Sequence, residues 1–368
     1  MDRILAASSF VDGLKHAINV ACQPHWFLIL SVVGLIVFLV GYRGLTKPSV
    51  AGPFAAICVV AFVASCFDPN FVEIVKKADN VPIVMMMCAM GFFLWLSFRQ
   101  AAVNDGRMER GEPLFEAGSD DKVLVWPDLV YIELIALVLC TAFLVVWAIV
   151  LPAPLEQPAD PNVAPNPAKA PWYFLGLQEM LVYFDPWLAG VVFPGLIIVG
   201  LIAVPYMDRN PRGNGYYTFK DRPFAITTFM FGFVILWALL IVFGTFLRGP
   251  NWNFFGPYEF WDHNRPAALL NREPRDLFWI EMLGQPIPGN FLLRELPGIV
   301  ILLAYFGLGP LILYGLFFRK LYQQMGFIRY SVMAFLLLTM LLMPIKMVLR
   351  WTLNLHYIVG ITEWFLNV

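Results

Sequence analysis

The sequence predicts an all-α membrane protein with about eight transmembrane helices, from its composition, its hydropathy and the placement of its charges. Of its 368 residues, 60% are hydrophobic and only 14% are charged, and the mean hydropathy is +0.70. Soluble domains carry about a quarter charged residues, so lipid must surround much of this chain. The net charge of −1 gives no basic excess, and no nucleic-acid partner is expected.

A transmembrane helix needs roughly 20 mostly apolar residues to cross a bilayer. Eight segments qualify: 26–42, 50–67, 82–98, 129–151, 187–206, 223–247, 297–318 and 330–349. Residues 1–25 are weakly amphipathic, which predicts an interfacial helix ahead of the first span. Lys346 and Arg350, at the end of the last span, are expected to extend to the membrane surface.

Basic residues gather in four loops, which predicts the orientation. The loops are 43–49, 99–128, 207–222 and 319–329. All four fall on one side if every segment spans, and the positive-inside rule assigns that side to the cytoplasm. Both termini and the long loops 152–186 and 248–296 then lie on the opposite, positive side of the membrane.

The charged stretch from Asp105 to Lys122 is expected to be a solvated linker. It divides the chain into three predicted regions. The first, residues 1–110, holds the interfacial helix and three spans; residues 111–248 hold three more. Residues 249–368 hold a positive-side loop, two spans and an interfacial carboxy terminus.

Five motifs follow one another through the middle of the chain, each near a predicted span boundary. They are Trp126-Pro127-Asp128-Leu129-Val130-Tyr131-Ile132, Gln157-Pro158-Ala159-Asp160-Pro161, Ala170-Pro171-Trp172-Tyr173-Phe174, Val204-Pro205-Tyr206 and Arg222-Pro223-Phe224-Ala225-Ile226-Thr227-Thr228. On these motifs, residues 126–248 resemble subunit IV of the cytochrome bf complex, the counterpart of the carboxy-terminal half of cytochrome b in bc complexes. The resemblance implies a cytochrome b C-terminal-domain-like core, with extra transmembrane helices at both ends.

The resemblance also implies a quinol-oxidation site in the loop 152–186, on the side of the membrane that the charges assign to it. Its quinol-binding wall would be Pro171, Trp172, Tyr173 and Phe174, with the Tyr173 hydroxyl as a polar, catalytic group. The chain departs from the family at Pro171, which stands where the family has a glutamate and cannot accept a proton.

Glu179 is the predicted catalytic proton acceptor in place of that glutamate. A helix over 172–184 would put it about two turns from Trp172 on nearly the same face. The alternative is an interfacial carboxylate that faces water. Glu133, one turn inside the fourth span, is a second candidate, for proton uptake at a quinone-reducing site, unless it merely extends to the membrane surface.

No haem or metal site is expected in this chain by itself. Its four histidines, His16, His25, His263 and His356, form no pair at helical spacing within a span. Neither the histidines nor the five cysteines have the spacing of a zinc or iron–sulfur site. The resemblance implies that haem b and the 2Fe-2S cluster belong to partners: a haem-b subunit, a Rieske protein and a c-type cytochrome.

The leading hypothesis is a quinol-oxidising subunit of a bc-type quinol:cytochrome c oxidoreductase in the bacterial inner membrane, in contact with lipids and those partner subunits. A non-catalytic scaffold of a respiratory or photosynthetic complex is the alternative, and its only support is the missing glutamate. A transporter is a third hypothesis. The sequence has no inverted repeat and no broken helices with paired intramembrane charges, and both absences oppose it.

Overall fold

The computed structural model describes residues 2–368 except 78, 119–121, 152–157, 159, 163–168, 209–214, 267–269, 362 and 364–365. Within this part, eight helices are long and apolar enough to cross a membrane, which confirms the predicted fold class. They are Pro24–Leu45, Pro48–Ser65, Asn80–Glu109, Val125–Val150, Leu188–Met207, Pro223–Leu247, Leu296–Met325 and Phe327–Leu353. Each predicted segment overlaps one of them.

Prolines begin several of the helices, since a proline at the first helical position loses no hydrogen bond. The α-helices are α1 (Asp2–Ala21), α2 (Pro24–Leu45), α3 (Pro48–Ser65), α4 (Pro69–Val75), α5 (Asn80–Glu109), α6 (Val130–Val150), α7 (Trp172–Met180), α8 (Phe193–Met207), α9 (Pro223–Met230), α10 (Leu239–Val242), α11 (Phe291–Arg294), α12 (Leu296–Leu313), α13 (Arg319–Met325) and α14 (Phe327–Leu353). The π-helical segments are η2 (Val125–Leu129), η3 (Leu188–Val192), η4 (Phe231–Ala238), η5 (Phe243–Leu247), η7 (Asp276–Met282) and η8 (Tyr314–Phe318). The 3-10 turns are η1 (Phe115–Gly118) and η6 (Pro250–Trp252), and two short strands, β1 (Gly360–Ile361) and β2 (Leu366–Asn367), pair antiparallel.

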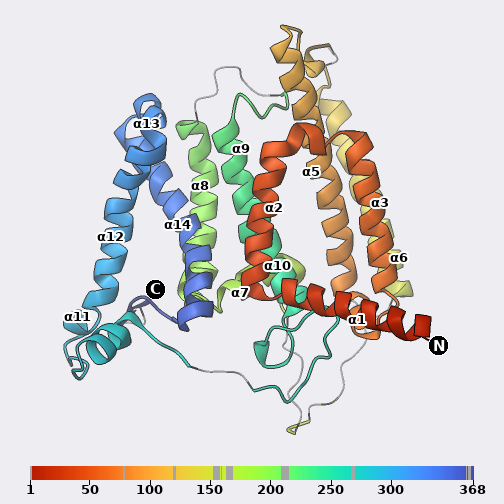
Figure 1. The fold of residues 1–368 in the computed structure, drawn as a ribbon. Coiled ribbons are helices and arrows are strands. Elements are labelled where there is room, and N and C mark those ends of the chain that lie inside the picture. The colour runs from red at the N-terminus through yellow and green to blue at the C-terminus, as the bar shows by residue number, and fades with distance from the viewer. Residues whose placement is uncertain are drawn as a thin grey trace.

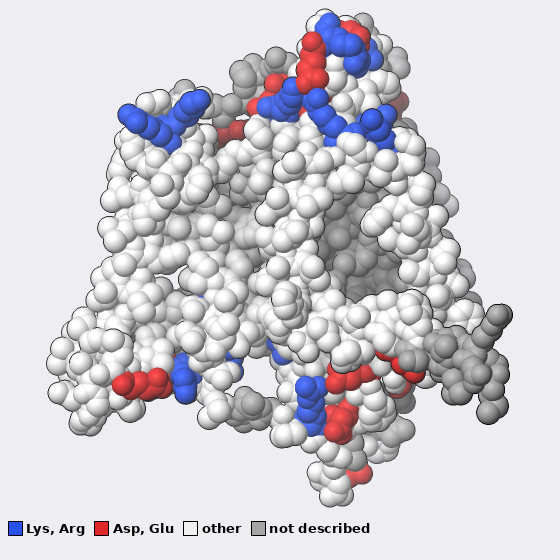
Figure 2. Space-filling view, viewed as in Figure 1, with Lys and Arg blue, Asp and Glu red and all other residues white. Residues whose placement is uncertain are grey.

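The spans stand side by side, and the loops group at two ends as the charge pattern predicts (Figure 1). Both termini lie at the same end, where α1 runs across the bundle rather than along it (Figure 1). Lys and Arg side chains gather at the opposite end (Figure 2), hereafter the basic end; the other is the terminal end. The assignment of the basic end to the cytoplasm stays a prediction.

The amino-terminal helices pack unevenly against the rest of the protein. Helices α2 and α5 contact each other, and α2 also packs against η4 of the sixth span. In contrast α3 and α6, all of whose residues are described, bury no side chain within the chain. Their apolar surfaces are therefore available to lipid or to partner subunits.

The predicted solvated linker from Asp105 onward is wrong at its beginning. Helix α5 continues to Glu109 and has 30 residues, about 45 Å of helix, so it extends past the bilayer at the basic end. Asn104 and Asp105 are fully buried there. The reason is that they bind the segment 217–220 that leads into α9, a partner more than 100 residues away that local sequence does not reveal.

The carboxy-terminal spans form a hairpin whose turn is at Gly326. This residue has a φ of +77°, a left-handed conformation that glycine adopts without strain, and it reverses the chain from α13 into α14. The expectation for Lys346 is wrong: its side chain is fully buried, and its Nζ donates to the carbonyl of His356 at 2.5 Å. The carboxy-terminal segment folds back over α14 and so covers this amine.

The largest buried core lies toward the terminal end and joins elements from the whole chain. It includes Leu28 of α2, Met180 of α7, Leu240 of α10, Met347 of α14 and Ile358 of the carboxy-terminal segment. Helix α7 therefore does not lie loosely on the surface. One of its faces is part of the core, and this fixes the position of the aromatic motif at its beginning.

Candidate functional site

Helix α7 carries the aromatic motif and begins directly after Pro171. Pro171 has an extended conformation and its carbonyl accepts a hydrogen bond from the backbone N–H of Phe174 at 2.8 Å. Small residues bring α7 close to the sixth span: Gly176 faces Trp237 and Ile241, and Gly244 faces the backbone of Leu175. The helix is thereby held against α10 and η5 at the terminal end of the bundle.

The outer face of α7 presents the aromatic residues. Tyr173 and Phe174 are each about half exposed, at 52% and 51%, and their ring centroids are 4.7 Å apart. Pro171 is also exposed. The side chain of Trp172 lies outside the described residues. The predicted wall is thus an open surface on this chain, and a partner subunit or a lipid-soluble ligand can cover it.

The inner face of α7 holds a charge network. Glu179 is fully buried and receives two N–H groups from Arg248: Nη2 to Oε1 at 2.6 Å and Nε to Oε2 at 3.1 Å. The hydroxyl of Tyr183 donates to the same carboxylate at 3.1 Å. Arg248 in turn donates to the carbonyl of Trp252 at 2.6 Å, and its guanidinium lies 3.7 Å from the ring centre of Phe254.

This network raises the pKa values of both Arg248 and Tyr183. Burial lowers the pKa of Arg248, but the charges of Glu179 and Tyr183 and the hydrogen bonds to them together outweigh burial, and the net pKa of Arg248 is raised. Burial and the same carboxylate both raise the pKa of Tyr183 well above its usual range. Arg248 and Tyr183 therefore keep their protons and supply three donors to Glu179.

The alternative of a water-facing carboxylate is wrong for Glu179, because its side chain has no exposure at all. The structure also does not bring Glu179 and the exposed Tyr173 together, since they lie on opposite faces of α7. The role of Glu179 in accepting a proton stays a prediction. Its three donor bonds all stabilise the ionised form, so proton acceptance requires Arg248 to move away first.

Lys169 lies two residues before Pro171 and was not singled out from the sequence. Its Nζ donates to the carbonyl of Thr245 in η5 at 2.6 Å and lies 5.4 Å from the ring centre of Trp261. Burial, followed by the charge of Lys77, lowers its pKa to about 7, against the opposing effect of Glu179. A lysine with this pKa exchanges a proton near neutral pH, beside the aromatic motif.

The other predicted residues lie away from α7. Glu133 is exposed on α6. Burial and nearby positive charges lower the pKa of His356 to about 4, so its imidazole is neutral at neutral pH. Within the described residues, no three His, Cys, Asp or Glu side chains cluster as metal ligands. The lack of such a cluster does not test the prediction that haem b and the iron–sulfur cluster belong to partners.

Arg248 and Lys169 are the residues that sequence reasoning missed, although a signal was present for Lys169. It is the one lysine or arginine of the loop 152–186, which is assigned to the positive side of the membrane, whereas 248–296 holds five arginines. A basic residue there needs a carboxylate, a carbonyl or an aromatic ring as partner. The carboxylate of Asp185 accepts from the backbone N–H of Trp187 at 2.9 Å and caps the helix that follows.

The fold and this site define a class: a multi-pass helical membrane protein with an aromatic, proline-led helix fixed across one end of the bundle. Residues 158–257 match the family described as Cytochrome b(C-terminal)/b6/petD, so this part of the chain is similar to that family. The match confirms the resemblance inferred from the motifs; it includes α7, Lys169 and Arg248 and leaves the helices at both ends outside. No solved structure matches the chain.

The match supports a cytochrome b-type subunit of the bc/b6f kind, a class that is found in quinol oxidoreductase complexes. Together with the eight apolar helices, the match supports a multi-pass electron-transport protein of an energy-transducing membrane.

Proposed function

We propose that this protein is the quinol-oxidising subunit of a bc-type quinol:cytochrome c oxidoreductase in a bacterial inner membrane. It acts with a separate haem-b subunit, a Rieske iron–sulfur protein and a c-type cytochrome. The observation that carries the proposal is the family match over residues 158–257. That stretch contains the aromatic helix α7 and the two basic residues of the site, Lys169 and Arg248.

The exposed outer face of α7 supports a site that is completed by partners. Oxidation of a quinol releases two protons and two electrons, and this chain provides walls and polar groups rather than redox centres. Pro171, Trp172 and Phe174 form the wall against the ring, and the Tyr173 hydroxyl orients a quinol hydroxyl. A cluster and a haem on the partner subunits would supply the electron acceptors.

Two residues are candidates for the proton path, since Pro171 replaces the acid of the family. Glu179 can accept a proton once its hydrogen bonds to Arg248 are broken. Lys169 accepts one directly when it is neutral, and its pKa of about 7 suits this role. Both candidates lie at the terminal end of the bundle, within ten residues of the aromatic motif in sequence, and their variants distinguish them.

The test is quinol-dependent cytochrome c reduction by the purified complex, with co-purification of b-type haem and a Rieske protein. Tyr173→Phe should lower turnover about tenfold through loss of one hydrogen bond to the reacting quinol. Substitution of the residue that accepts the proton should lower turnover about 100-fold. Tyr206→Phe, an exposed tyrosine at the basic end, is the matched control and should leave turnover unchanged.

The proton acceptor is identified by comparing Glu179→Gln with Lys169→Met. A Glu179→Gln complex with normal turnover rules out Glu179 and leaves Lys169 as the acceptor. If the chain purifies without haem-bearing subunits, or if turnover is insensitive to Tyr173, the scaffold hypothesis replaces the catalytic one.

A further inference from the structure

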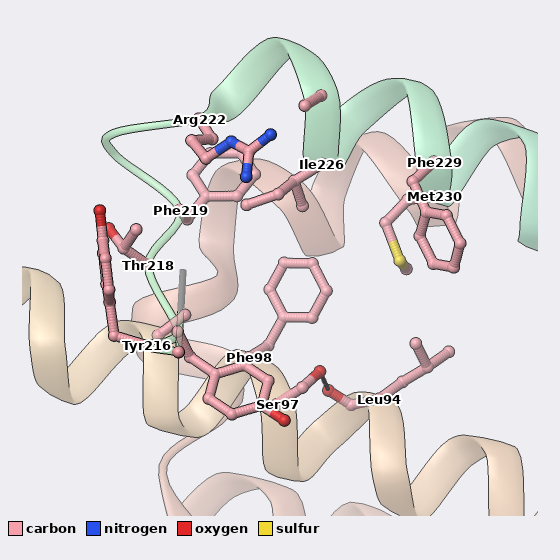
Figure 3. A pocket seen from close by; sticks show the side chains of 14 residues that line it. Leu94, Ser97, Phe98, Tyr216, Thr218, Phe219, Arg222, Ile226, Phe229 and Met230 are labelled. Carbon is pink, nitrogen blue, oxygen red and sulfur yellow. Dashed lines mark hydrogen bonds between the residues drawn. The ribbon is translucent and has the colours of Figure 1, made fainter. Parts of the chain in front are cut away.

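The amino-terminal helices and the part of the chain that matches the cytochrome b family border a cavity at each end of the bundle. The cavity at the basic end has a volume of about 390 Å³ and includes polar groups, among them Ser97 of α5 and Arg222 just before α9 (Figure 3). The other, hereafter the terminal cavity, has a volume of about 380 Å³. It is lined by Phe62 of α3, Ile74 and Val75 of α4, Val84 and Cys88 of α5 and Phe246 of the sixth span, among others.

The lining of the terminal cavity selects an apolar ligand. Its described lining residues are apolar, apart from the thiol of Cys88. A polar group buried there would lose its hydrogen bonds to water without replacement, and a peptide backbone would meet the same penalty. A hydrocarbon chain has no such groups and gains dispersion contacts with the lining side chains. The cavity is therefore suited to a chain of methylene groups.

The terminal cavity lies at the depth of lipid acyl chains and reaches the surface that faces them. Val84 and Cys88 lie about one and two turns after the first residue of α5, roughly 6 and 12 Å along the helix. Cys88 is exposed, and so is Phe62 in the last turn of α3. Helix α3 buries no side chain within the chain. A lipid chain can therefore enter the cavity sideways from the bilayer.

Tyr258 holds the roof of the terminal cavity in place. The roof is made of α4, which connects α3 to α5 at the terminal end, and of Pro257. The hydroxyl of Tyr258 lies 2.6 Å from Oγ of Ser65, and its ring stacks on Phe71 of α4 with centroids 5.6 Å apart. Its backbone N–H donates to Oδ1 of Asn19 in α1 at 3.0 Å. The roof is therefore preformed, which lowers the entropic cost of binding.

A lysine stands at the rim of the terminal cavity. Val75, the last residue of α4, lines the cavity, and Lys76 follows it directly with an exposed side chain. A lysine has a flexible stem that can bring its ammonium group to the polar surface of the membrane. Lys76 is therefore placed to contact the phosphate of a lipid whose chain lies below it.

We propose that the terminal cavity binds one acyl chain of a membrane phospholipid, with the headgroup phosphate beside Lys76. The site is built by α3, α4 and α5, outside the residues that match the cytochrome b family, together with Phe246 and Pro257 inside that match. Met87 and Phe246 line the cavity and also pack against the buried cluster that contains Leu175 of α7. The bound chain fills the space behind this cluster.

The test uses a phospholipid with a diazirine midway along one acyl chain, added to the protein as purified in mild detergent. After illumination, the labelled peptides should include residues 71–75 and 84–88. Val84→Phe fills part of the cavity and should lower this labelling about tenfold. Val60→Phe makes the same change on the exposed face of α3 and should leave labelling unchanged. Equal labelling of the two variants overturns the proposal.

A lysine substitution tests the headgroup contact. Lys76→Gln should weaken labelling of 71–75 and 84–88 about fivefold, because one lysine near an anionic headgroup contributes a modest attraction. Lys47→Gln, at an exposed lysine of the basic end, is the matched control and should change nothing. An equal effect of both substitutions overturns the contact between Lys76 and the phosphate.

The unmodified protein provides a measurement that needs no variant to fold. Cys88 lines the terminal cavity, whereas Cys140 is exposed on α6, away from it. When phospholipid is returned to the delipidated protein in detergent, alkylation of Cys88 by N-ethylmaleimide should slow about tenfold. Alkylation of Cys140 should keep its rate. Equal protection of the two thiols, or none at Cys88, overturns the proposal.

Competition separates an acyl chain from the tail of a quinol. Excess unlabelled phospholipid should displace the probe from 71–75 and 84–88, and the same amount of a long-tailed quinol should not. Displacement by the quinol alone overturns the proposal and assigns the cavity to the quinol tail. Binding is measured without turnover, so its failure leaves quinol oxidation at α7 standing, and failure of quinol oxidation leaves the lipid site standing.

Discussion

Arg248 and Glu179, 69 positions apart in the chain, form a buried ion pair with Nη2 of Arg248 2.6 Å from Oε1 of Glu179. The pair joins the end of the sixth span to the aromatic helix α7. Because Tyr183 and the carbonyl of Trp252 take up further hydrogen bonds of the two groups, the pair is a small closed network rather than an isolated contact.

Removing one partner of this pair should destabilise the protein strongly. Arg248→Leu leaves the Glu179 carboxylate buried without its cation, and the expected loss of unfolding free energy is about 3–5 kcal/mol. The double variant Arg248→Leu with Glu179→Leu should recover much of that loss, because no charge is then buried. Thermal unfolding of the purified protein in detergent measures both.

The exposed pair Arg265–Glu259 is the matched control for this prediction. Its groups are about half exposed and 3.3 Å apart, and Arg265→Leu should cost no more than about 1 kcal/mol. Equal effects of the two arginine substitutions would contradict a special role for the buried pair.

Asp105→Asn should loosen the connection between α5 and the segment before α9. The asparagine keeps one oxygen acceptor and turns an N–H₂ group toward the donors of Thr218 and Tyr42, which leaves buried groups unpaired at an expected cost of about 2–3 kcal/mol. The thermal midpoint should fall. Asp128→Asn, at an exposed aspartate, is the control; a midpoint unchanged in both would show that Asp105 is not a structural anchor.

Lys169 should make stability depend on pH above neutrality. Its folded-state pKa is about 7, whereas a lysine in an unfolded chain titrates near 10.4. Between these values the unfolded chain binds a proton that the folded protein does not, so the contribution of Lys169 to stability rises with pH from about 7 upward and falls as pH drops toward 7.

The comparison of Lys169→Met with the unmodified protein isolates this contribution. The methionine variant should be the more stable one at pH 7, and its advantage should shrink as the pH is raised to about 9. An advantage independent of pH would show that the amine titrates at its ordinary value.

Gly298 of α12 should tolerate no side chain. A Cβ at this position would overlap the carbonyl oxygen of Ile358, in the carboxy-terminal segment that packs on α12. Gly298→Ala should therefore lower the unfolding free energy by about 1–3 kcal/mol. Gly307→Ala lies on the same helix with open space around it and should be neutral or slightly stabilising, because alanine favours helix.

Much of the architecture could be predicted from the sequence alone. The eight spans follow from apolar length, because the thickness of the bilayer sets that length independently of tertiary contacts. The grouping of the loops at two ends follows from the distribution of lysine and arginine. The resemblance to the family followed from short motifs such as Pro171 to Phe174, because several of them occur in the same order as in the family.

Only the tertiary structure decided which polar groups are buried and with which partners. Asp105 and Lys346 were expected at the surface, and for Glu179 the sequence left a proton acceptor of the pocket and a water-facing carboxylate both open. All three are buried, because folding brings partners to them: Arg248 for Glu179, the segment 217–220 for Asp105 and the carbonyl of His356, where the chain folds back after α14, for Lys346. Hydropathy depends on neighbours along the chain, whereas burial of a charge depends on partners brought together by folding.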